Sequence, residues 1–577
     1  MGASESKLGF KQGIFRLAEE DNIPPTDPLW AKFYQLPETA DDVLALWSPN
    51  DLHALTLTRP DDRPLPNTQV HPRKNLETLV YTCISRLHHL QALSANAEQQ
   101  RSSSLEALNC IRMLTRAFPY IYEAEHISQW EHRFFWKPQT PQQVWDKRNN
   151  RPGSWVDGLN PQADLDLTSD GPSEEHASEK VLDPPLGEQL IDILVRYLFW
   201  PGFTLPKKQS TDGSSEQRAD FRIWNSGIGC RYSAGMTKEN EKNAVEVLRL
   251  LLSLCSRQMY IPPHAVSAAD VRPLVYITTK TDRQIVLTLI CSLLNTILKY
   301  NPASWIVPLE WSSDGDPRTR LVHTSLQFLL VLLLYSEPSG ETNQFRKAMG
   351  RLHRAEDFQF IQQGITMVLT QPVSGINIPG MQRECPWAGE ALSLFWELLQ
   401  VNKRFQLFII ETDRVHDFVV MVLYYAMAYK DEPAKQGLIR MCALILQTLS
   451  VDSSFGKRLN KVFVGQDSLP ASVKINHFHG SYADFLVTTI HTLMTTTKGR
   501  LDSIYPTFLA IIYNVSPYVK DLQRATSSKI LDLFIQLSNP KFLLEKETNY
   551  TLLVTLLQAI STTLAWQSEC RSLATLP

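Results

Sequence analysis

The sequence predicts an all-α protein, built as an irregular α-solenoid of the armadillo or HEAT type or as a large helical array with disordered loop insertions. Apolar residues recur at helical spacing through most of the chain and leave a narrow polar stripe in each segment. The alternation of apolar and polar residues that is typical of strands is scarce, and its best candidate is 272–279. No clean repeat period is visible, so the two forms stay open.

The composition indicates a folded protein without a general affinity for nucleic acid. The 577 residues are 43% hydrophobic and 20% charged, and their net charge at pH 7 is −3. Binding a phosphate backbone requires a basic surface, so this balance argues against a nucleic-acid partner. The eight cysteines form no C-x-x-C pair, and several lie in apolar helical stretches. We interpret them as buried thiols of a reducing compartment.

Changes in composition divide the chain into four predicted regions. Proline, glycine, serine and aspartate dominate the third region, which cannot bury enough apolar surface to fold throughout. Its Trp155, Phe221 and Trp224 are candidate partner contacts, with local packing as the alternative. The regions are an N-terminal myristoylation and membrane-anchoring segment (1–20), an N-terminal helical region (21–136), a loop-rich, partly disordered insertion with a short helix at 190–200 (137–243), and a C-terminal helical array (244–577).

The helical array shows the same pattern from one segment to the next. Polar residues recur every three or four positions, and the remaining positions are nearly all apolar, so neighbours must cover each helix on more than one side. The segments with this pattern are 243–260, 283–299, 389–405, 435–450 and 527–540. The apolar runs 328–335 and 418–429 are shorter than the roughly 20 residues of a membrane span, so we predict core helices there.

The first residues match a lipidation signal. After removal of Met1, Gly2 becomes the N-terminal residue, Ser6 completes the pattern M-G-x-x-x-[ST], and Lys7 follows. Acyl transfer requires an unhindered glycine amine and a small residue at the position of Ser6. The pattern predicts myristoylation of Gly2, with an ordinary frayed terminus as the alternative.

A second membrane attachment is expected, because one myristoyl chain binds with a partition constant of only about 10⁴ M⁻¹. Lys11 and Arg16, together with Lys7, are candidates for contact with anionic headgroups. Gly9 and Gly13 weaken this segment as a helix. The alternatives are that its apolar face docks on the protein itself, or that a membrane-bound partner supplies the second attachment. The apolar face comprises Leu8, Phe10, Ile14, Leu17 and Ala18.

Catalytic, metal-binding and cofactor-binding patterns are lacking, and we predict no enzymatic activity. His477 and His479, with Asp484, suggest at most an unrecognised hydrolase or metal site. Their spacing matches no familiar site, and a polar turn before a helix is the alternative. The basic stretch 345–354 is a candidate for phosphoinositides or an acidic partner, with a solvated helix face as the alternative.

Several segments in fixed order resemble the high-temperature-induced dauer-formation protein family, a distant relative of dymeclin. They run from Gly2 to Leu522, so the resemblance covers nearly the whole chain. The segments are MGASESKLGFKQGIFRL, NLETLVYTCISRL, NCIRMLTRAFPYIYE, LICSLLNTILKYNP, LHRAEDFQFIQQGI, LFWELLQVNKRFQLFII, FGKRLNK, GSYADFLV and IIYNVSPYVKDL.

The resemblance implies an N-myristoylated peripheral protein on the cytoplasmic face of Golgi and trans-Golgi membranes, with a cytosolic pool. Members take part in protein sorting and secretory-vesicle formation, so unidentified trafficking proteins are the expected partners. The lipid-bearing glycine carries over to Gly2, within the motif that includes Ser6 and Lys7. An alternative is a Golgi anchor that recruits a cytosolic enzyme such as a deubiquitinase. Family chains usually extend further than Pro577, so the functions of a C-terminal tail are not carried over.

Overall fold

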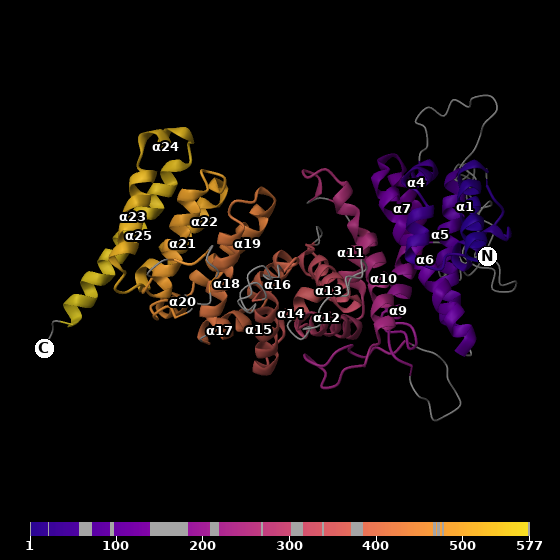
Figure 1. The fold of residues 1–577 in the computed structure, drawn as a ribbon, viewed down its shortest axis with the longest axis horizontal. Coiled ribbons are helices and arrows are strands. Elements are labelled where there is room, and N and C mark those ends of the chain that lie inside the picture. Colours follow the sequence, from indigo (N-terminus) through magenta and orange to yellow (C-terminus); the bar gives the residue numbers. More distant parts are fainter. Residues whose placement is uncertain are drawn as a thin grey trace, which may run out of the picture. The chain divides into compact units, whose positions relative to one another are not determined.

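The structure is a computed structural model, and its regular elements are helices (Figure 1). Among the described residues, β pairing is limited to isolated bridges such as Val462 with Ser481. The predicted all-α class is therefore confirmed. The description covers the chain except residues 1, 21, 57–71, 93–96, 139–182, 208–218, 267–268, 270, 302–315, 337–339, 371–384, 413, 465–468, 470–472, 476–477 and 575–577.

The chain forms two compact units, and each is described separately. Unit 1 comprises 1–226, 232–292 and 314–344, and unit 2 comprises 227–231, 293–313 and 345–577. The chain passes between the units at several points, and one of them falls within α12 (Arg283–Leu298), whose first residues belong to unit 1 and whose last six belong to unit 2. The four regions expected from composition stay a prediction.

Unit 1 is built around α6 and α10. The helix α10 packs against both α6 and α13, and the hydroxyl of Tyr122 on α6 donates to the Leu254 carbonyl at 2.9 Å. The helices of unit 1 are α1 (Gly2–Glu19), α2 (Leu29–Gln35), α3 (Ala40–Leu46), α4 (Pro49–Thr56), α5 (Pro72–Ala92), α6 (Ala97–Glu123), α7 (Ser128–Trp136), α9 (Leu186–Tyr197), α10 (Lys238–Cys255), α11 (Arg272–Val275) and α13 (Pro317–Leu334), with short turns η1 (Glu125–Ile127) and η3 (Ser256–Tyr260).

The segment 272–279, the best candidate for a strand, is helical. The segment forms α11 followed by one π-helical turn, η5 (Tyr276–Lys280). The hydroxyls of Thr278 and Thr279 donate to the carbonyls four residues earlier at 2.7 and 2.8 Å, which supports helical geometry despite the β-branched side chains. Ile277 and Thr278 are buried, so packing has overridden local propensity.

The short helix expected at 190–200 is present as α9, and the aromatic residues after it pack locally. Trp224 is fully buried, and its indole N–H donates to the Leu198 carbonyl at 3.1 Å. The ring of Phe221 lies 5.2 Å from that of Phe199. Local packing is thus the correct alternative for these two residues, whereas Trp155 lies outside the described residues.

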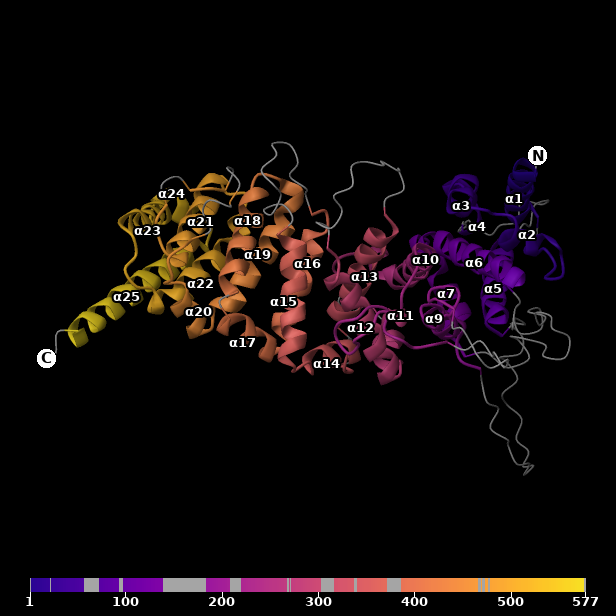
Figure 2. The same cartoon turned by 60° about the horizontal axis from the view of Figure 1, so that its bottom comes forward.

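Unit 2 is a succession of packed helices (Figure 2). One row runs from α16 to α19, α22 and α25, and a second runs from α18 to α21 and α23. The helices are α14 (Gln344–Gly350), α15 (Ala355–Leu369), α16 (Ala388–Val401), α17 (Lys403–Glu411), α18 (Val415–Ala428), α19 (Gln436–Ser450), α20 (Ser453–Arg458), α21 (Tyr482–Thr496), α22 (Tyr505–Val515), α23 (Arg524–Leu537), α24 (Pro540–Glu545) and α25 (Asn549–Ala574), with short turns η7 (Pro433–Lys435), η9 (Asp502–Ile504) and η10 (Ser516–Tyr518).

The two long apolar runs are core helices, as predicted. Phe328 and Leu332 on α13 and Phe418 and Val422 on α18 are all fully buried. In the part of the chain that the structure describes, no helix has the length and hydropathy that crossing a bilayer requires.

Candidate functional site at the N-terminus

The helix α1 lies against α2, α3, α4 and α5 of unit 1. Phe10, Ile14 and Leu17 are spaced by four and three residues, so they share one face of the helix. Each is at most 1% exposed. The apolar face predicted for this segment is therefore docked on the protein itself along these three residues, which was one of the alternatives.

Two glycines allow α1 to approach α2 closely. A β-carbon at Gly13 would lie 3.1 Å from Leu29 Cδ1 and 3.4 Å from Phe33 Cζ, and one at Gly9 would lie 3.3 Å from Leu36 Cδ1. The rings of Phe10 and Phe33 meet edge to face at 5.9 Å. The glycines that lower the helical propensity of α1 thus make room for its packing.

Ser6 and Lys7 of the lipidation motif, and Lys11 beyond it, form hydrogen bonds or ion pairs with other residues of unit 1. The Ser6 hydroxyl donates to the Leu36 carbonyl at 2.8 Å, and Lys7 Nζ lies 3.0 Å from Asp42 Oδ1. Lys11 Nζ donates to Asp51 Oδ2 at 2.9 Å. Burial disfavours the charged form of both carboxylates, but hydrogen bonds, including those from the lysines, outweigh it and hold the pKa of each below its usual value.

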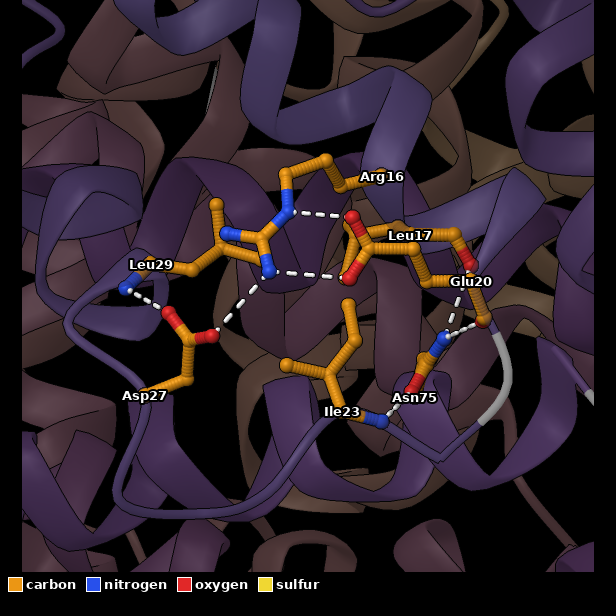
Figure 3. Close-up of polar contacts among 7 residues, drawn as sticks. All are labelled: Arg16, Leu17, Glu20, Ile23, Asp27, Leu29 and Asn75. Atoms are coloured by element: carbon orange, nitrogen blue, oxygen red, sulfur yellow. Dashed lines mark hydrogen bonds and ion pairs between the residues drawn. The ribbon is translucent and has the colours of Figure 1, made fainter.

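Arg16 joins the end of α1 to the loop that follows (Figure 3). Its Nε lies 2.6 Å from Glu20 Oε1, and its Nη2 lies 3.0 Å from Asp27 Oδ2. The Arg16 hydrogen bonds lower the pKa of both carboxyl groups, and the Leu29 N–H, which donates to Asp27 Oδ1 at 2.7 Å, adds to the effect on Asp27. Arg16, like Lys11, is thus engaged in ion pairs, and the contact of either side chain with headgroups stays a prediction.

Asn75 on α5 holds the C-terminal end of α1. Its side-chain amide donates to the carbonyls of Leu17 and Glu20 at 3.0 and 2.7 Å and accepts from the Ile23 N–H at 2.8 Å (Figure 3). The residue is fully buried. A helix leaves its last carbonyls without partners inside the helix, and one amide from a distant helix satisfies two of them here.

The Arg16 cluster predicts a pH-dependent effect of Asp27→Asn. At pH 7 we expect the free energy of unfolding to fall by roughly 1 kcal/mol, because the asparagine loses the ion pair with Arg16. A carboxylate whose pKa is lowered in the folded state stabilises the fold above its unfolded pKa of about 3.9. The difference from wild type should therefore shrink as the pH falls below about 4 and the Asp27 carboxyl takes up a proton.

Urea denaturation of both proteins from pH 7 to pH 3 tests this expectation. Glu19→Gln is the matched control, since Glu19 is an exposed carboxylate at the end of α1. A stability difference for Asp27→Asn that is constant over the whole pH range would contradict the role of the charge.

The histidine cluster does not form a metal site in the described residues. Asp484 is 1% exposed and lies in the first turn of α21, where its Oδ2 accepts the N–H and hydroxyl of Ser481 at 2.9 and 2.8 Å. Its Oδ1 accepts the Gln523 N–H at 3.0 Å. His479 is exposed, and His477 lies outside the described residues. Within the described part of the chain, no group of three or more His, Cys, Asp or Glu is placed to hold a metal ion.

The basic stretch 345–354 is divided between packing and solvent. Arg346 Nη2 lies 3.0 Å from Glu397 Oε1, whose side chain is 2% exposed. Lys347 on α14 is exposed, as a solvated helix face requires, and Arg351 and Arg354 are exposed in the connection between α14 and α15. An acidic ligand for these three side chains stays a hypothesis.

Sequence reasoning missed the groups that fix α1. Asn75, Asp42 and Asp51 lie 22 or more residues beyond the end of the predicted anchoring segment, and no local pattern connects them to it. The pair of Arg16 and Glu20 could have been found, because residues four apart on a helix are neighbours.

Comparison with known proteins identifies the family. The model of the high-temperature-induced dauer-formation protein family matches residues 1–572. The Schizosaccharomyces pombe protein named Ubp5-interacting protein ftp105 is 28% identical over 97% of this chain and 65% of its own length. Human Protein HID1 is 29% identical over 99% of this chain and 70% of its own length. The chain thus spans about two thirds of the length of these relatives, and it belongs to the high-temperature-induced dauer-formation protein family.

Proposed function

We propose that this chain is an N-myristoylated peripheral scaffold on the cytoplasmic face of Golgi and trans-Golgi membranes, where it acts in protein sorting and secretory-vesicle formation. The observation that carries the proposal is Gly2 in the sequence MGASESK, which matches the pattern M-G-x-x-x-[ST]. Membership of the family supports it. A cytosolic pool is expected, because one acyl chain binds reversibly.

The geometry of α1 is compatible with this role. Phe10 is the first of its three fully buried apolar residues, and Gly2 begins the helix eight residues earlier. At 1.5 Å per residue, the acylated glycine lies about 12 Å along the axis from that first buried anchor. The docking of α1 on unit 1 is thus compatible with an acyl chain at Gly2.

The scaffold is proposed to be an irregular α-solenoid. The two rows of contacts in unit 2, α16–α19–α22–α25 and α18–α21–α23, support this form, because each layer covers the preceding one. Such arrays offer extended surfaces to protein partners. Binding rather than catalysis is the proposed output, and the use of Asp484 in capping α21 supports this assignment.

The second candidate function is recruitment of a cytosolic enzyme, such as a deubiquitinase, to the Golgi membrane. The name of the Schizosaccharomyces pombe relative records an interaction with Ubp5, which favours a protein-binding role of this kind. Proximity labelling in cells separates the candidates: enrichment of vesicle-sorting proteins supports the first, and enrichment of one soluble enzyme supports the second.

Gly2→Ala is expected to move the protein from the membrane fraction to the cytosol, because alanine at this position does not accept the acyl chain. Secretory sorting should fail with it, and a foreign membrane anchor fused to the variant should restore sorting. The measurement is membrane fractionation of cells together with imaging.

Ser4→Ala, at a position that the motif leaves open, is the control and should behave like wild type. An unchanged membrane fraction of Gly2→Ala would show that the lipid is not the anchor. Failure of the foreign anchor to restore sorting would show that the amine of Gly2 serves another purpose.

A further inference from the structure

Two apolar side chains of α1 point away from the protein. Leu8 is 60% exposed and Phe15 is 46% exposed. They are seven residues apart, so they lie about 10 Å from each other on one side of the helix, opposite the buried Phe10 and Ile14. Leu44 on the neighbouring helix α3 is also 51% exposed.

The exposed pair is held in this orientation. On the opposite side of the helix, Phe10, Ile14 and Leu17 pack against the rest of unit 1. The side chain of Asn75 fixes the C-terminal end of α1. A rotation of α1 that buried Leu8 and Phe15 would expose these three residues, break the bond of Lys11 to Asp51 and cost more apolar contact than it gained. The two side chains therefore remain presented to the surroundings.

The basic side chains of α1 form ion pairs with carboxylates of the protein itself. Lys7, Lys11 and Arg16 each lie within 3.0 Å of a carboxylate oxygen. These pairs leave little unbalanced positive charge on the helix for anionic headgroups. The apolar pair, in contrast, stays about half exposed, although Lys11 Nζ lies 4.8 Å from the centre of the Phe15 ring. It shares α1 with the proposed acylation site at Gly2, from which Leu8 is about 9 Å along the axis.

We propose that Leu8 and Phe15 insert into the interfacial layer of a lipid bilayer and form the second attachment beside the acyl chain. The inference rests on the proposed function, since the lipid of Gly2 brings this face to the membrane. A bilayer is the occupant that the observations favour, because any surface that receives the acyl chain lies next to Leu8. The contact is hydrophobic, so its strength depends little on anionic lipid or on salt.

Vesicle flotation of the full chain, co-expressed with an N-myristoyltransferase, tests the inference. The vesicles consist of phosphatidylcholine alone or of phosphatidylcholine mixed with phosphatidylserine. We expect the double variant L8S/F15S to lower the partition constant roughly tenfold or more on both, while Leu8→Trp raises it several-fold. Leu407→Ser is the matched control, because Leu407 on α17 is 46% exposed and should leave binding unchanged.

The outcomes distinguish the apolar contact of Leu8 and Phe15 from the lipid anchor at Gly2. Intact mass confirms the acyl group in every variant that keeps Gly2 and its absence in Gly2→Ala, and thermal unfolding confirms the fold. Wild-type binding by acylated L8S/F15S would overturn the inference and leave the lipid anchor standing. Binding that requires phosphatidylserine and is lost in salt would also overturn it, in favour of the cations. Wild-type binding by Gly2→Ala, with a loss in L8S/F15S, would uphold the apolar contact and refute the lipid anchor.

Discussion

Asn75→Leu is expected to lower the free energy of unfolding of unit 1 by about 3 kcal/mol. The leucine keeps most of the volume but removes three hydrogen bonds, so the carbonyls of Leu17 and Glu20 and the N–H of Ile23 lose their side-chain partner. A buried polar group left without a partner costs about 1–3 kcal/mol. The first consequence should be the release of α1, which this amide ties to α5.

Hydrogen exchange of the peptides that cover α1, together with urea denaturation, measures this effect. We expect exchange in α1 to accelerate before that in α10, because local opening precedes global unfolding. Asn50→Leu is the control, since Asn50 is exposed on α4 and should change stability by less than about 0.5 kcal/mol. Wild-type protection of α1 in Asn75→Leu would contradict the assignment of Asn75 as its tether.

Gly364→Ala is expected to destabilise unit 2 by about 2–4 kcal/mol. A β-carbon at this position of α15 would lie 2.6 Å from both Cβ and the carbonyl oxygen of Leu298, at the end of α12. Neither atom can move without its backbone, so the two segments must separate. In an unobstructed helix the same substitution stabilises by about 0.5–1 kcal/mol, which makes the expected sign diagnostic of the close approach.

Gly437→Ala provides the matched comparison. Gly437 lies in the first turn of α19, and a β-carbon there would have no neighbouring atom within 4 Å. We expect it to raise the free energy of unfolding by up to about 1 kcal/mol. Differential scanning calorimetry of the two variants measures whether each substitution raises or lowers the free energy of unfolding. Equal effects of Gly364→Ala and Gly437→Ala would show that α15 and Leu298 do not meet as closely as described.

The fold class could be predicted because burial repeats at the helical period. In 435–450, for example, Ile439, Cys442 and Leu446 are spaced as the buried face of α19 requires, and all three are buried. The segment 272–279 is the best strand candidate in the sequence because valine, isoleucine and threonine favour strands locally, yet it is helical. The packing of Ile277 and Thr278 and the threonine hydrogen bonds decided the outcome, and neither can be read from a single segment.

The packing of α1 on unit 1 could be predicted only in part. The spacing of Phe10, Ile14 and Leu17 indicated one apolar face, but a bilayer and the protein's own surface satisfy such a face equally well. The carboxylates that neutralise Lys7 and Lys11 come from α3 and α4, so charge alone suggested headgroup contacts for cations that are paired in the structure. Long-range partners decide which residues of an amphipathic helix remain exposed.

In the proposed function, an acyl chain at Gly2 tethers the helical scaffold to the membrane. The most direct measurement is intact-mass spectrometry of the native protein, purified separately from the membrane and cytosolic fractions of the same cells. We predict that the membrane-bound molecules lack Met1 and carry one myristoyl group. Membrane-bound molecules that retain Met1, or that have an unmodified Gly2 amine, would contradict it.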